Sequence, residues 1–268
     1  MSDTVDLYDN VYGDFESHAE AAVRKAAFGE DIGQSSWVTA EDWLRFADQV
    51  NVCEDSRVLE VGSGSGGPAV YLATARGCHV VGVDLNEHGV RNGERLATMR
   101  GIADRVTFQL VDASKPLPFP AATFDVILSN DAMCHISNRL EVLRDWYRVL
   151  RPHGRILFTD GMVVTGLVSQ EELATRSSIG FYLFVPPGEN ERLIVRAGFR
   201  LLTSDDVTAA AEIIAQRWHN AREQYRKELI VREGDSNFSG LQRFLACVHR
   251  LSAERRLSRY CYIAEKSM

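Results

Sequence analysis

Between residues 55 and 160 the chain alternates short apolar runs, rich in β-branched side chains, with segments of helical periodicity. The apolar runs fall within residues 57–73, 78–86, 105–119, 124–130 and 148–162. Runs of this kind predict buried strands, and strands that alternate with helices predict a parallel sheet with helices on both faces. We therefore expect an α/β fold built on a Rossmann-like, doubly wound sheet.

The segments before and after this region have a different pattern of apolar and polar residues. Residues 1–54 are polar and aromatic, with helical stretches at 18–28 and 39–50, and Thr39 is placed to cap the second. After residue 160 we expect a connecting helix and loop, a sixth strand within 197–207, a charged helix at 217–233 and a final strand at 256–266. This predicts an N-terminal helical lid (1–54) and one domain (55–268) with a cap insertion around 161–199.

A glycine-rich turn follows the first predicted strand. Its glycines are Gly62, Gly64, Gly66 and Gly67, and Glu60 lies two positions before the first of them. Glycines let the backbone approach a ligand closely, and the helix that follows presents its free N–H groups to that ligand. The turn therefore predicts a site for a nucleoside-bearing cofactor. Its spacing alone fits a nicotinamide dinucleotide as well as S-adenosylmethionine (SAM).

Two further carboxylates follow predicted strands. Asp84 ends the second strand, where a carboxylate can accept hydrogen bonds from both hydroxyls of a ribose. Asp112 closes the third strand in a short loop, where it can accept from an exocyclic adenine amine. The second acid favours SAM, because a nicotinamide cofactor leaves Asp112 without a role. We include the neighbours Leu85 and Ala113 in the predicted cofactor site.

At this point the chain resembles the class I SAM-dependent methyltransferases. The matching features occur in order: the acidic glycine turn, the ribose acid, the adenine acid, the segment after the fourth strand and the R-V-L-R-P-x-G turn at 148–154. The resemblance implies seven strands, with an antiparallel last strand inserted between the fifth and sixth. It also implies methyl transfer from SAM to a nitrogen or oxygen of a small-molecule metabolite, with C-methylation as an alternative.

Three segments are more loosely similar to the glycine, sarcosine and dimethylglycine N-methyltransferases. They are 33–37 (GQSSW), 130–136 (NDAMCHI) and 159–162 (TDGM). In those enzymes the N-terminal segment folds over SAM, so the resemblance implies that Gln34 and Trp37 contact the cofactor. The chain departs from these enzymes in substrate capture, because no motif fixes a small carboxylate and Arg176 is only one candidate for a clamp.

Methyl transfer to a protonated amine or a hydroxyl requires a group that takes the proton. His135 follows the fourth strand at the carboxyl edge of the sheet and is our candidate catalytic residue. Asn130 precedes it, and we expect it beside the methionine end of SAM. Asp160, at the end of the fifth strand, is a candidate for orienting the substrate's proton. The alternative for His135 is a helix-start histidine that merely caps or packs.

The composition of the chain limits its possible partners and its cellular location. A net charge of −7 argues against a nucleic-acid or anionic membrane partner, because both need clustered positive charge. The five cysteines form no CxxC pair, so we expect no metal site and a reducing, cytoplasmic location. The predicted partner is a small-molecule substrate, and a homodimer stays open. A nicotinamide-dependent oxidoreductase and a non-catalytic SAM-binding protein are the remaining alternatives.

Overall fold

The fold is built around one seven-stranded sheet. The computed structural model describes residues 8–13 and 15–267. The strand order is β3-β2-β1-β4-β5-β7-β6; β1 to β5 run parallel, and β7 is antiparallel to both β5 and β6. This confirms the predicted sheet, including the position of the last strand. The strands are β1 (Arg57–Val61), β2 (His79–Asp84), β3 (Val106–Leu110), β4 (Phe124–Asn130), β5 (Leu150–Val164), β6 (Phe199–Asp206) and β7 (Leu257–Lys266).

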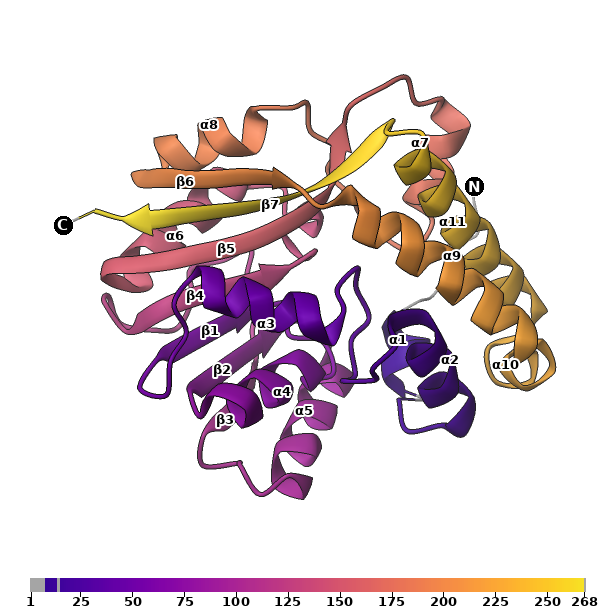
Figure 1. The fold of residues 1–268 in the computed structure, drawn as a ribbon, viewed down its shortest axis with the longest axis horizontal. Coiled ribbons are helices and arrows are strands. Elements are labelled where there is room, and N and C mark those ends of the chain that lie inside the picture. Colours follow the sequence, from indigo (N-terminus) through magenta and orange to yellow (C-terminus); the bar gives the residue numbers. More distant parts are fainter. Residues whose placement is uncertain (1–7, 14, 268) are drawn as a thin grey trace.

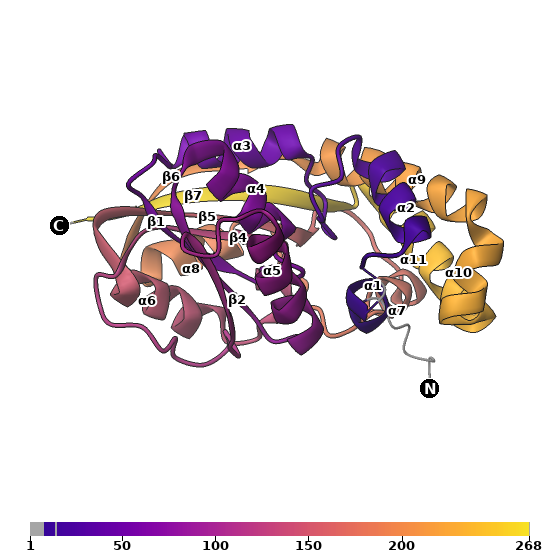
Figure 2. The ribbon, with the colours of Figure 1, turned by 90° about the horizontal axis from the view of Figure 1, so that it is seen from below.

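Helices cover both faces of the sheet because successive strand residues point to opposite sides. Val58 packs with Trp43 in one buried cluster, whereas its neighbour Leu59 packs with Trp146 in another. Figure 2 shows α3 on one side of the sheet and α6 and α8 on the other. The covering helices are α3 (Ala40–Gln49), α4 (Gly67–Arg76), α5 (Glu87–Met99), α6 (Arg139–Val149) and α8 (Glu189–Arg196).

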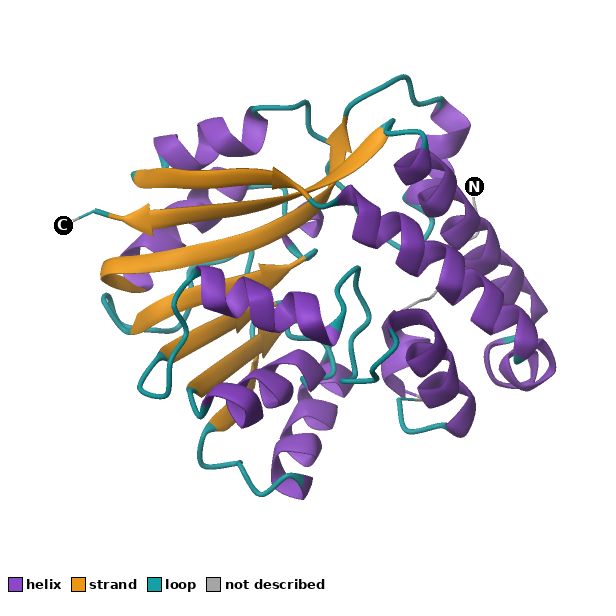
Figure 3. Cartoon of the chain, in the orientation of Figure 1, coloured by secondary structure: helices purple, strands orange, loops and turns teal. Residues whose placement is uncertain are grey.

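A separate helical layer lies beyond the carboxyl ends of the parallel strands (Figures 1 and 3). Helices from the two ends of the sequence meet there, and Phe28 and Trp218 pack with their ring centroids 5.6 Å apart in its buried core. We call this group the helical layer. It consists of α1 (Tyr8–Gly13), α2 (His18–Phe28), α7 (Gln170–Arg176), α9 (Thr208–Gln224), α10 (Arg226–Glu233) and α11 (Asp235–Ala253).

Local signals in the sequence explain several helix ends. The side chain of Thr39 accepts a hydrogen bond from the Asp42 backbone and caps α3, as its position predicted. The glycine turn leads directly into α4, which has a proline in its first turn. Within the described residues, no helix combines the length and apolarity needed to cross a membrane.

Candidate active site

A cavity of about 760 Å³ lies between the carboxyl edge of the sheet and the helical layer. The ten residues predicted to bind the cofactor and the predicted base, His135, all line this one cavity. They are Gln34, Trp37, Glu60, Gly62, Gly64, Asp84, Leu85, Asp112, Ala113, Asn130 and His135. The topology brings them together because the carboxyl ends of parallel strands meet at one edge, where the strand order reverses at β1 and β4.

The glycine turn has a backbone that a side chain could not share. Gly62 and Gly64 adopt φ angles of +75° and +53°. A Cβ on Gly62 would lie 2.4 Å from the Cβ of Ala132, and one on Gly64 would lie 2.7 Å from the hydroxyl of Tyr12. Both glycines are therefore required by conformation and by space, and the turn leaves its backbone open to the cavity.

Two carboxylates stand beside this turn, the buried Glu60 and the half-buried Asp84. Asp84 accepts hydrogen bonds from the backbone N–H groups of Gly64 (2.7 Å) and Asn86 (2.8 Å), whereas Oε2 of Glu60 is buried without a partner. Burial raises the pKa of Glu60 well above its usual range, and the charge of Asp84 adds to the effect. Burial also raises the pKa of Asp84, against the opposing backbone hydrogen bonds. A buried carboxylate without a partner, close to a second carboxylate, favours a bound cation.

Asp112 occupies a more open position at the rim. Its Oδ1 accepts from the hydroxyl (2.6 Å) and the backbone N–H (3.0 Å) of Ser114, and Lys115 lies 3.1 Å from its Oδ2. The Ser114 hydroxyl is the main reason why the pKa of Asp112 is lowered. Asp112 therefore stays ionised and able to accept from an amine. The side chain of Leu85 is 71% exposed at the same rim, free to pack against a flat ring.

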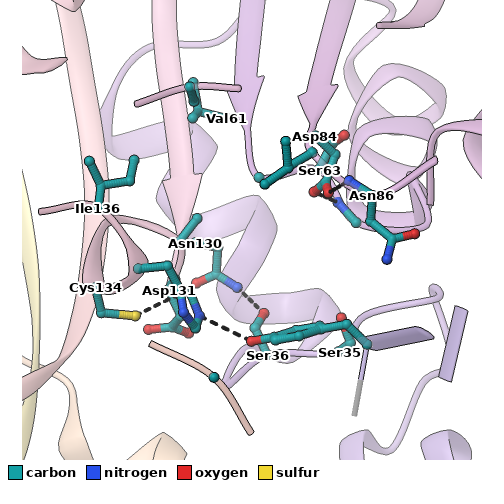
Figure 4. A pocket seen from close by; sticks show the side chains of 18 of the residues that line it. Ser35, Ser36, Val61, Ser63, Asp84, Asn86, Asn130, Asp131, Cys134 and Ile136 are labelled. Atoms are coloured by element: carbon teal, nitrogen blue, oxygen red, sulfur yellow. Dashed lines mark hydrogen bonds between the residues drawn. The ribbon is translucent and has the colours of Figure 1, made fainter. Parts of the chain in front are cut away.

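The end of β4 is held by a buried polar network. Oδ1 of Asn130 accepts from Nη2 of Arg259 (2.7 Å) and from the Thr159 hydroxyl (2.9 Å). Oδ1 of Asp131 accepts from Nε of the same arginine (2.8 Å), while its Oδ2 accepts from the backbone N–H of Trp37 (3.2 Å). Asn130 also donates to Ser36 across the cavity, as Figure 4 shows. This network ties the N-terminal segment to the sheet.

The side chains predicted in the N-terminal segment already make contacts within the protein. The amide of Gln34 accepts from Ile32 N–H and donates to the carbonyl of Glu30, both at 2.9 Å. Trp37 is buried and packs edge-on against Trp218 with ring centroids 6.0 Å apart. Asp160 does not line the cavity: it is fully buried and paired with Arg139 at 2.5 Å. The role that the sequence suggested for Asp160 is therefore wrong.

His135 ends the short 3₁₀ helix η1 (Met133–His135), immediately after β4. Its Nδ1 lies 2.8 Å from the carbonyl oxygen of Phe181, which can only accept, so Nδ1 carries the hydrogen. Its Nε2 is therefore an acceptor, and the hydroxyl of Tyr8 lies 3.1 Å from it. Burial lowers the pKa of His135, so the ring is neutral near pH 7. The geometry therefore provides a neutral base in the cavity wall whose accepting nitrogen, Nε2, is within hydrogen-bond distance of the Tyr8 hydroxyl.

Several lining residues had no signal in the sequence. Trp218 and Phe244 reach the cavity from α9 and α11. Arg176, which the sequence had offered as a candidate clamp, reaches it from α7. Arg259 supports the site from β7, more than 120 positions along the chain from the residues it holds. Aromatic residues at helical spacing predict a packed helix face, but nothing in their pattern shows which cavity that face will close.

Comparison with known proteins identifies the family. The methyltransferase domain profile matches residues 59–158. A 27-O-demethylrifamycin SV methyltransferase of Amycolatopsis mediterranei is 29% identical over 82% of this chain and 78% of its own. Methyltransferase GfsG of Streptomyces halstedii is 30% identical over 76% of this chain and 77% of its own. A sarcosine/dimethylglycine N-methyltransferase of Halorhodospira halochloris is 29% identical over 77% and 70%, respectively.

A solved structure shares the fold. Haemonchus contortus phosphoethanolamine N-methyltransferase 2, solved with phosphomonomethylethanolamine and S-adenosylhomocysteine, superposes with a TM-score of 0.81 at 22% identity, covering 97% of this chain and 60% of that one. The family match decides between the two cofactors that the glycine turn left open. The carboxylates of Glu60 and Asp84 and the open glycine turn fit the ammonium and nucleoside of SAM. The chain belongs to the class I SAM-dependent methyltransferases.

Proposed function

We propose that this enzyme transfers a methyl group to a nitrogen or oxygen atom of a small molecule, with His135 as the base that takes the acceptor's proton. The observation that carries the proposal is the fixed tautomer of His135, whose Nδ1 donates to the carbonyl of Phe181 and whose Nε2 is left to accept. The net charge of −7 and the cysteines, none of which forms a disulfide, support a cytoplasmic enzyme without a nucleic-acid partner.

The residues that would hold SAM each bind a different part of the cofactor along the cavity. Glu60 would accept from the ammonium group, and Asp84 can accept from the ribose while its backbone partners keep it in place. Asp112 can accept from the adenine amine, with Leu85 against the ring. When bound, SAM supplies an electrophilic methyl group whose transfer relieves the positive charge on sulfur. Catalysis then depends on aligning a deprotonated acceptor with that group.

The proton has two routes to His135. Burial raises the pKa of Tyr8 well above its usual value, so its hydroxyl keeps its proton and donates to Nε2. The acceptor can take the place of Tyr8 at Nε2 and give its proton directly, or it can give a proton to the Tyr8 oxygen as that oxygen passes its own to His135. Tyr8→Phe separates the routes, because only the relay requires the hydroxyl.

The test is His135→Ala, measured by S-adenosylhomocysteine release and by SAM binding. Loss of a positioned base lowers kcat by about 10²–10⁴-fold, with little change in SAM affinity. In the unaltered enzyme kcat should fall as the pH drops below the ordinary histidine range, because the pKa of His135 is lowered. That acid limb should be absent from the residual activity of the variant.

His249→Ala is the matched control. Nδ1 of His249 also faces a backbone carbonyl, that of Glu212 at 3.2 Å, and His249 does not line the cavity. Its replacement should leave kcat and the pH profile unchanged. Normal turnover in His135→Ala would refute the assigned role.

A further inference from the structure

Five arginines are almost fully buried in this protein, with 1% to 5% of their surface exposed. A buried charge is costly unless a partner neutralises it. Four of the five have a carboxylate partner within the chain. These pairs are Arg24 with Asp31 (2.9 Å), Arg139 with Asp160 (2.5 Å), Arg259 with Asp131 (2.8 Å), and Arg222 with Glu233.

Arg176 is the exception. It is 3% exposed and lines the cavity, yet it has no ion pair among the described residues. Its Nε and Nη1 are buried and have no hydrogen-bond partner. The guanidinium is instead held between aromatic rings, 4.6 Å from the centroid of Tyr182 and 4.9 Å from that of Phe244. The rings orient the group and compensate part of its charge, but they leave the donors on Nε and Nη1 without a partner.

A second donor without a partner lines the same cavity. Nε1 of Trp218 is buried and makes no hydrogen bond in the described structure. An indole nitrogen can only donate. At the glycine turn the carboxylate oxygen of Glu60 lacks a hydrogen-bond donor. Elsewhere in the cavity Arg176 provides donors and a positive charge, and Trp218 provides one further donor. The two regions of the cavity therefore have opposite requirements.

We propose that Arg176 is the binding site for an anionic oxygen group of the methyl acceptor, a carboxylate or a phosphate, and that Trp218 donates to the same acceptor. This inference rests on the proposed function, because it places the acceptor beside His135. The anion supplies the negative charge that the other four buried arginines find within the chain. It leaves no buried donor of Arg176 unpaired once the acceptor is bound.

The position of Arg176 also limits the acceptor's size and charge. The rings of His135 and Tyr182 are 4.4 Å apart between centroids, and Arg176 packs against that same Tyr182 ring. The anionic group and the atom that is methylated must therefore be only a few bonds apart. A buried guanidinium in this wall also disfavours acceptors that carry a net positive charge, although the aromatic lining alone would suit a cation.

The test uses three probes that do not depend on knowing the acceptor: benzoate, the uncharged benzamide and inorganic phosphate. Each is titrated into the S-adenosylhomocysteine complex and followed by tryptophan fluorescence, because Trp37 and Trp218 line the cavity. We expect benzoate or phosphate to bind, and benzamide to bind at least about tenfold more weakly than benzoate, since a charged hydrogen bond is lost. Benzoate binding points to a carboxylate acceptor and phosphate binding to a phosphorylated one.

Arg176→Gln should abolish the preference for benzoate over benzamide, and Arg176→Lys should restore part of it. Trp218→Phe should weaken the binding of the anion by about two- to tenfold. Arg192→Gln is the control, because it removes the same charge from an exposed residue outside the cavity. A role for Arg176 in packing alone would lower stability without changing the preference between the two probes.

Binding of S-adenosylhomocysteine, measured in parallel, keeps the two proposals apart. If the nucleoside does not bind, the cofactor site and the proposed function fail. If it binds but benzoate and benzamide bind equally, or none of the probes binds, or Arg176→Gln keeps the preference, then the anion site is refuted while methyl transfer stands.

Discussion

Replacing Glu60 by glutamine should weaken SAM binding while it stabilises the ligand-free protein. Glu60 is 3% exposed, and its Oε2 has no partner among the residues that the structure describes. With SAM bound, we expect this oxygen to accept a charged hydrogen bond from the ammonium group. Loss of such a bond costs about 1.5–3 kcal/mol, which corresponds to roughly a tenfold to over a hundredfold loss of affinity. Glutamine keeps the volume and removes the charge.

The effect on stability has the opposite sign. The pKa of Glu60 is raised in the folded protein, so folding favours its protonated form. Stability is then fully present below the ordinary carboxyl pKa and is lost as the pH rises through the raised value. Glutamine has no proton to lose in this range. The thermal midpoint of the ligand-free Glu60→Gln variant should therefore decrease less between acidic and alkaline pH than that of the unaltered protein. For the same reason SAM binding to the unaltered protein should release protons where Glu60 is still protonated in the ligand-free state.

Calorimetric titration with SAM in buffers of different ionisation enthalpy measures both the affinity and the proton release, and thermal unfolding across pH measures the stability. Ser129→Ala is the control, because Ser129 is a fully buried β4 residue with an unpartnered hydroxyl outside the cavity. It should leave SAM affinity unchanged. Equal SAM affinity in Glu60→Gln and the unaltered enzyme would refute the assignment of Glu60 to the ammonium group.

Three other outcomes are expected. Asp84→Ala should weaken the affinity for SAM, measured by calorimetry, by about tenfold to over a hundredfold, because the ribose hydroxyls lose their acceptor. Unchanged affinity would refute the assignment of Asp84 to the ribose. Hydrogen exchange in residues 8–43 should slow on adding S-adenosylhomocysteine, because Tyr8 and Trp37 already bond to the site; equal exchange rates would refute the lid. Activity should survive EDTA, and loss that magnesium or zinc restores would show a metal-dependent reaction.

The sheet and the cofactor half of the site were predictable because their signals are local. The strands β1, β2 and β4 each end in a residue that lines the cavity, so the position of Asp84 follows once β2 is recognised. Parallel topology then brings the separate strand ends to one edge. Glycines with positive φ are also readable from sequence, because few other residues tolerate that conformation.

The acceptor half could be predicted only in part. The sequence offered His135 and Arg176, but most of the surrounding residues come from helices that meet only in the tertiary structure. Trp218, Phe244 and Arg176 lie on three different helices, and each has an ordinary helical context in the sequence. The lack of an internal carboxylate for Arg176 is visible only once the neighbours of all buried arginines are known. Asp160 shows the converse: it follows the pattern of a site residue, but Arg139 and Asn190 bind it away from the cavity.

The most direct test of the account follows the methyl group itself. The enzyme is incubated with SAM that carries an isotopically labelled methyl group and a cell extract, and the label is then measured separately in small molecules, proteins and nucleic acids. We predict that the label enters the small-molecule fraction, on a nitrogen or oxygen of an anionic compound, and that His135→Ala largely abolishes this transfer. Label recovered in protein or nucleic acid, with none in small molecules, would contradict the account.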